Sequence, residues 1–98
     1  MRDYDLVLVI TPEITDDDLP VALEKINRAI AQRGATIKEV LRWGRRRLSY
    51  PIGRFREANY VLEHLQLEPG QTSEVESGLR VTEEVLRHVL VRQQLQAS

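Results

Sequence analysis

Arginine dominates one short segment of the chain, and its spacing with aromatic residues indicates contact with a nucleic acid. The arginines from residue 42 to residue 56 are Arg42, Arg45, Arg46, Arg47, Arg54 and Arg56, and the aromatic residues among them are Trp43, Tyr50 and Phe55. No acidic residue interrupts this arginine segment, and the next one is Glu57. A planar guanidinium binds phosphate through paired hydrogen bonds, and aromatic rings stack on unpaired bases. The sequence therefore predicts RNA contact along residues 42–56.

The charge of the chain is balanced overall and segregated locally. Its 98 residues predict a single domain and include 14 Lys and Arg against 15 Asp and Glu, for a net charge of -1. An acidic run at Asp16–Asp18 is typical of a helix N-terminus, where carboxylates complement the helix dipole. Cysteine is absent, which fits a reducing cytoplasm, and no apolar run predicts a signal peptide or a membrane helix.

Residues that could perform catalysis or hold a metal do not cluster in the sequence. His64 and His88 fall on non-adjacent strands, where we expect them on opposite faces of the sheet. The chain shows no phosphate-binding glycine loop and no nucleophile motif, and the acidic loop Thr11-Pro12-Glu13 could not cradle a phosphate. We therefore expect no catalytic residues, no metal, no cofactor and no small-molecule substrate.

Alternating and helical hydrophobic patterns define the elements that must position the arginine segment. Strands are predicted at 4–11, 35–43, 59–67 and 85–92, with a bulge between Ile37 and Val40. Gly44 and the arginines lead from the second strand to a loop marked by Pro51 and Gly53. One helix should follow a cap at Thr15, carry Pro20 in its first turn and end at Gly34. A second should span 73–80 behind a capping box of Ser73 and Glu76.

The order of these elements is strand, helix, strand, strand, helix, strand. Two split crossovers with this order predict an α+β, ferredoxin-like βαββαβ sandwich, a four-stranded antiparallel sheet with two helices on one face. The first and third strands should be central. The domain should span residues 1–92, and residues 93–98 should form a short polar tail.

One face of the predicted sheet is apolar although no helix covers it. A one-sided antiparallel sheet normally exposes polar residues, but this face would carry Val7, Val9, Tyr60, Leu62, Val89 and Val91. Strands favour β-branched residues in any setting. A contiguous open patch nevertheless favours a docking surface for a protein partner.

The residues from Gly44 to Ile52 resemble the signature of the bacterial small-subunit (30S) ribosomal protein S-six family. Further positions fall in the family's register, namely Met1, Arg2, Tyr4, Pro12, Gly34, Ala35, Leu90 and Val91. The resemblance implies a cytoplasmic, structural protein of the small ribosomal subunit. It further implies binding to the central domain of 16S ribosomal RNA as a heterodimer with ribosomal protein S-eighteen.

Site residues follow from this resemblance together with the two predicted surfaces. The RNA-binding candidates are Arg2, Tyr4, Arg45, Arg46, Arg47, Arg87 and Arg92. The partner-binding candidates are Leu48, Tyr50, Pro51, Ile52, Tyr60 and Leu62.

Two rival functions share the predicted topology. An RNA-recognition motif requires an aromatic-rich third strand, and residues 58–61 offer only Tyr60. A ferredoxin-like small-ligand-binding or homodimeric regulatory domain would use the open apolar face. It would not need the arginine segment.

Overall fold

The computed structural model describes residues 1–93, which form one sheet and two helices in the predicted order. The elements are β1 (Arg2–Ile10), α1 (Leu19–Ala31), β2 (Thr36–Ile52), β3 (Phe55–Leu67), a 3-10 turn (Pro69–Gln71), α2 (Thr72–Arg80) and β4 (Val85–Arg92). The sheet order is β2-β3-β1-β4, and every neighbouring pair is antiparallel. This topology confirms the ferredoxin-like prediction, with the first and third strands in the centre.

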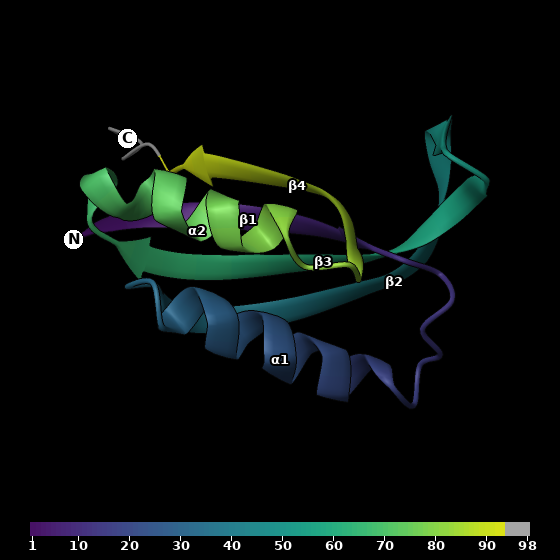
Figure 1. Ribbon diagram of the computed structural model, residues 1–98, viewed down its shortest axis with the longest axis horizontal. Coiled ribbons are helices and arrows are strands. Elements are labelled where there is room, and N and C mark those ends of the chain that lie inside the picture. Colours follow the sequence, from purple (N-terminus) through teal and green to yellow (C-terminus); the bar gives the residue numbers. More distant parts are fainter. Residues whose placement is uncertain (94–98) are drawn as a thin grey trace, which may run out of the picture.

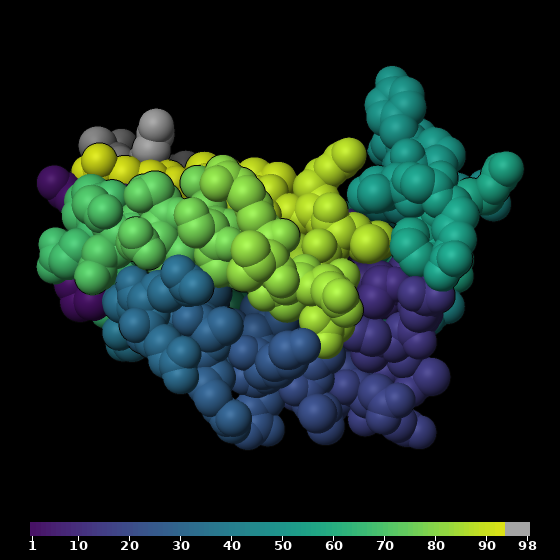
Figure 2. Space-filling view, viewed as in Figure 1, coloured from purple at the N-terminus to yellow at the C-terminus, as the bar shows by residue number. Residues whose placement is uncertain are grey.

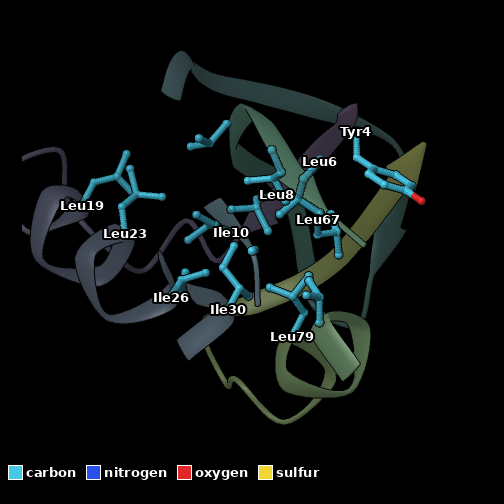
Figure 3. Close-up of a cluster of buried hydrophobic side chains, with 14 residues drawn as sticks. Tyr4, Leu6, Leu8, Ile10, Leu19, Leu23, Ile26, Ile30, Leu67 and Leu79 are labelled. Atoms are coloured by element: carbon cyan, nitrogen blue, oxygen red, sulfur yellow. The ribbon is translucent and has the colours of Figure 1, made fainter. Parts of the chain in front are cut away.

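Both helices lie against the same face of the sheet, as Figure 1 shows. Apolar side chains from β1, β3 and the two helices converge between these layers (Figure 3), and the fully buried ones include Leu6, Leu8, Ile10, Leu19, Ile26, Ile30, Leu65, Leu67 and Leu79. Burying this apolar surface supplies the main driving force for folding. No helix within residues 1–93 is long and apolar enough to cross a membrane.

Helix α1 forms where apolar residues recur at intervals of three or four, so that Leu19, Leu23, Ile26 and Ile30 share the buried face. Pro20 lies in the first turn, as predicted, where its missing N–H costs no helical hydrogen bond. Gly34 has φ +107°, which confirms the predicted left-handed position after the helix. The predicted cap at Thr15 is wrong, because a turn at Thr15 precedes the helix and Asp18 occupies the cap position.

The predicted capping box at α2 is also wrong. The helix begins at Thr72, directly after the 3-10 turn, and no side chain caps it. Thr72 instead donates from Oγ1 to the Pro69 carbonyl at 3.1 Å. Pro69 starts the turn early, so Ser73 lies inside the helix and cannot act as its cap.

The strands follow the predicted order, but β2 ends well after the predicted 35–43 and β3 begins before the predicted 59–67. The register of β2 against β3 shifts between Ile37 and Glu39, which confirms the bulge. Gln93 donates its backbone N–H to the Asp3 carbonyl at 2.8 Å, so it continues the pairing of β4 with β1. Residues 94–98 of the predicted tail lie outside the described part of the chain.

Candidate nucleic-acid interface

The arginine segment lies on a two-stranded ribbon that extends beyond the four-stranded sheet (Figure 1). β3 pairs with β1 only up to Asn59, which lies opposite Ile10, whereas β2 and β3 remain paired from Arg45–Asn59 to Ile52–Phe55. β2 therefore runs on through the arginines to Ile52, and Pro51, which the sequence predicts to mark the loop together with Gly53, lies in the strand instead. Gly53 (φ +57°) and Arg54 form a two-residue hairpin turn, with glycine at its first central position as in a type II′ turn.

Arginines of this ribbon differ in whether other protein groups already bind them. Arg45 donates to the Pro12 carbonyl at 2.7 Å and to Glu57 Oε1 at 3.1 Å. Arg54 donates to Glu13 Oε2 at 2.5 Å. The other arginines of the segment are exposed and form no ion pair with residues 1–93. These are Arg46, Arg47 and Arg56 on the ribbon and Arg42 in the adjoining sheet.

Aromatic rings lie beside two of these guanidinium groups. The Arg46 guanidinium carbon is 5.7 Å from the centre of the Trp43 ring, and that of Arg54 is 5.1 Å from the Phe55 ring. These distances lie in the range of cation–π attraction, which restricts an exposed guanidinium without neutralising its charge. Trp43 is 46% exposed, so the Arg46–Trp43 pair presents both a phosphate ligand and a stacking surface.

The RNA candidates outside the ribbon fall at two different ends of the sheet. Arg87 pairs with Val9 near the base of the ribbon. Arg2 and Arg92 lie towards the opposite end of β1, roughly 23 Å and 17 Å from the level of Arg87 at about 3.3 Å per residue. The structure therefore groups Arg87 with Arg46 and Arg47 and separates Arg2 and Arg92 from them.

Tyr4 does not fit its predicted contact with RNA. Its side chain is only 6% exposed and packs in the core between the sheet and the helices (Figure 3). β1 turns alternate side chains to opposite faces, and Tyr4 shares the helix-covered face with Leu6 and Leu8. The tyrosine ring therefore serves folding.

The open face of the sheet carries the predicted apolar row. Val7 pairs with Leu62 on one side and with Val89 on the other, so these three side chains lie side by side. Leu41 pairs with Leu62 and extends the row onto β2, a member that the sequence patterns missed because the bulge shifts its face. Val89 and Val91 are 47% and 54% exposed. Val9 is only 5% exposed, so the prediction that it belongs to the uncovered surface is wrong.

A polar cluster borders this row at the end away from the ribbon. His64 Nδ1 lies 2.5 Å from Asp5 Oδ1, and His64 Nε2 lies 3.3 Å from Glu39 Oε1. Gln93 also donates to Asp5, at 2.6 Å. The prediction that the two histidines lie on opposite faces is confirmed, because His88 lies on the helix-covered side, 3.4 Å from Glu76.

Partner candidates are also divided by the structure. Tyr60 and Leu62 lie on the open face of the sheet, whereas Leu48, Tyr50, Pro51 and Ile52 lie near the tip of the ribbon. Tyr50 is 80% exposed. Figure 2 shows the ribbon, in teal, projecting from the body and separated from β4 by a notch.

Groups that could hold a ligand or a metal are scarce in the described residues. A shallow hollow of about 280 Å³ between α1 and the start of β4 is lined by Ile14, Asp18, Val21, Ala22, Lys25 and Glu84. Lys25 and Glu84, two of the charged residues that line this hollow, form an ion pair at 2.9 Å. Residues 1–93 contain no cluster of three metal-binding side chains.

Comparison with known proteins finds one family over nearly the whole chain. The family model for Ribosomal protein S6 matches residues 3–92. The "Small ribosomal subunit protein bS6" of Moorella thermoacetica is 31% identical over 98 residues and 100% of both chains. That of Dehalococcoides mccartyi is 34% identical over 91 residues, which cover 93% of this chain and 84% of the relative.

Solved structures show the same relationship. The crystal structure of 30S ribosomal protein S6 from Thermotoga maritima matches with a TM-score of 0.83 and 27% identity, over 94% of this chain and 87% of that one. The C-terminal domain of MgtC from Mycobacterium tuberculosis matches with a TM-score of 0.55 and 14% identity, over 100% of this chain and 95% of that one. This second likeness concerns the fold alone.

Proposed function

The chain belongs to the ribosomal protein S6 family of the small ribosomal subunit, and from this premise we propose that it binds ribosomal RNA together with a protein partner. The family is structural rather than enzymatic. The RNA in the proposal is the central domain of 16S ribosomal RNA, and the partner is ribosomal protein S-eighteen. Each of the two surfaces described above corresponds to one of these components.

The ribbon supports the RNA part of the proposal, and its free arginines are the observation that carries it. Arg46 and Arg47 are exposed, adjacent and without an ion pair to residues 1–93, although the chain as a whole is slightly acidic. Because consecutive residues of a strand point to opposite sides, the two guanidinium groups can bind phosphates on both sides of the ribbon. Arg87 extends the basic surface towards the sheet.

The open sheet face supports the protein part of the proposal. Its row of Leu41, Leu62, Val7 and Val89 spans all four strands. When a partner removes such an apolar row from water, the burial stabilises the complex. The ribbon candidates Leu48, Tyr50, Pro51 and Ile52 would contact the same partner where it meets the RNA.

A salt titration of RNA binding tests the proposal. The native chain, mixed with ribosomal protein S-eighteen and a transcribed central domain of 16S ribosomal RNA, should bind with an affinity that falls steeply with salt. The double variant Arg46→Ala, Arg47→Ala should bind more weakly and with a shallower salt slope. A matched control, Arg28→Ala with Arg80→Ala, removes the same charge from the helices and should leave the affinity nearly unchanged. Equal effects of the two double variants would contradict a specific role for the ribbon.

A homodimeric regulatory domain is the alternative that the open face also permits. In that case the apolar row would bind a second copy of the chain, and the complex would persist at high salt because apolar burial is not screened. Sedimentation analysis of the isolated protein separates the two cases. A monomer that associates only with S-eighteen and RNA supports the proposed function, and a salt-resistant dimer supports the alternative.

A further inference from the structure

The sheet changes from four strands to two at one register position. Asn59 is the last residue of β3 that pairs with β1, opposite Ile10, and on its other side it pairs with Arg45 of β2. Beyond this position the ribbon has no third strand beside it. An isolated two-stranded ribbon is marginally stable and strongly twisted, so its direction depends on what holds its base.

Side chains from this same position hold the loop that leaves β1. Asn59 is 1% exposed, and its Nδ2 donates to the Thr11 carbonyl at 3.0 Å and to the Ile14 carbonyl at 3.2 Å. Arg45 donates to the Pro12 carbonyl between them at 2.7 Å. Three backbone carbonyls of the loop at 11–14 therefore accept hydrogen bonds from the one pair of residues at which the ribbon begins.

Arg45 is also bound on the ribbon side. Its Nη1 donates to Glu57 Oε1 at 3.1 Å, two residues beyond Asn59 on β3. The guanidinium thus connects both strands of the ribbon to the body of the protein, and its side chain is only 43% exposed. A phosphate that bound through Nη1 and Nη2 in these directions would compete with a carboxylate and a backbone carbonyl.

We propose that Arg45 is a positioning residue, which with Asn59 fastens the ribbon to the loop at 11–14 and so directs Arg46 and Arg47 towards RNA, and that it does not itself bind phosphate. The consequence for RNA depends on the proposed function above. The role of Arg45 in fixing the direction of the ribbon does not depend on the proposed function. This proposal differs from the prediction that Arg45 is a phosphate ligand.

The neighbouring arginine provides the contrast. Strand alternation places Arg46 on the opposite side of the ribbon from Arg45, where it lies over the Trp43 ring instead of reaching the loop. Adjacent residues of the same type therefore differ in role because of the side on which they lie. Arg46→Ala is for this reason the matched comparison for Arg45→Ala.

A salt titration separates the two roles. Each lost phosphate contact should lower the salt slope of RNA affinity by roughly 0.7 to 0.9. Arg46→Ala should show this loss of slope, with the S-eighteen and 16S central-domain mixture as the probe. Arg45→Ala should lower the affinity several-fold at every salt concentration and leave the slope unchanged. A loss of slope in Arg45→Ala equal to that in Arg46→Ala would overturn the assignment.

Distances between spin labels measure the direction of the ribbon without RNA. The chain has no cysteine, so Ser49→Cys on the ribbon and Gln32→Cys after α1 give one defined pair of labels. The distance distribution should be narrow in the native background and clearly broader in Arg45→Ala. A second pair at Gln32 and Ser73, both in the body, should stay unchanged in Arg45→Ala, which excludes general unfolding.

The two measurements distinguish failure of the positioning role from failure of the proposed function. A narrow ribbon distance that Arg45→Ala does not alter would overturn the positioning role, whatever the RNA result. Failure of the native chain to bind the mixture of S-eighteen and 16S central-domain RNA would refute the proposed function. A broader distance distribution in Arg45→Ala would still support the positioning role of Arg45.

Discussion

Replacing Glu63 with glutamine should stabilise the protein at pH 8 and change its stability little at pH 5. Glu63 lies on β3 facing the helices, is 0% exposed, and has no hydrogen-bond partner for either carboxyl oxygen among residues 1–93. Loss of hydration disfavours the carboxylate and raises the pKa of Glu63 from its usual 4.5 to about 7. The Asn27 side chain opposes this rise only in part, because the loss of hydration is the larger effect.

The size of the effect follows from proton linkage. The folded state binds the Glu63 proton more tightly than the unfolded state, so stability is highest below pH 4.5, declines as the pH rises, and levels off above the folded pKa of about 7. The difference between the two pKa values corresponds to about 3 kcal/mol at most, of which about 2.5 kcal/mol falls between pH 5 and pH 8. A domain of this size is stable by roughly 5–15 kcal/mol, so the loss is substantial.

Urea denaturation at pH 5, 6, 7 and 8 measures this directly. The free energy of unfolding of Glu63→Gln minus that of the native chain should increase by about 2.5 kcal/mol from pH 5 to pH 8. The control Glu83→Gln removes an exposed carboxylate and should give a nearly constant difference. A difference for Glu63→Gln that stays constant across this pH range would refute the reasoning that the carboxyl is desolvated.

Three further predictions concern the two surfaces and the backbone. Arg46→Ala with Arg47→Ala should flatten the salt slope of RNA binding by about 1.4 to 1.8 if each guanidinium binds one phosphate, as a filter-binding titration would show. Leu62→Asp should abolish capture of purified S-eighteen, whereas Val21→Asp on the exposed surface of α1 should not; capture by both variants would remove the open face from the interface. Gly34→Ala should lower the free energy of unfolding by about 1 kcal/mol or more in a urea titration, because φ +107° is strained for alanine; an unchanged midpoint would contradict that strain.

The sequence was sufficient for the architecture because each element has a strong local pattern. Leu19, Leu23, Ile26 and Ile30 recur at helical spacing, and the alternation in β1 and β3 identifies central strands. The burial of Glu63 also has a signal in the sequence. It lies in step with Val61 and Leu65, and that spacing alone places a carboxyl on the buried face.

The ribbon could not be predicted from local propensity. Gly44, Pro51 and Gly53 are poor strand formers, so the sequence predicts that the second strand ends at Trp43 and that Pro51 and Gly53 mark a loop. Pairing between β2 and β3 overrides that preference. The role of Arg45 was equally hidden, because its partner is the backbone carbonyl of Pro12, and a backbone carbonyl has no sequence signature.

The most direct test of a role in the small ribosomal subunit is to count the protein in subunits purified from its own cells. Subunits washed at raised salt would be analysed by quantitative mass spectrometry against a labelled standard of the full chain. The account predicts close to one copy per small subunit, retained through the wash together with S-eighteen. Recovery of the protein in the soluble fraction as a salt-resistant dimer, and its absence from the subunit, would contradict it.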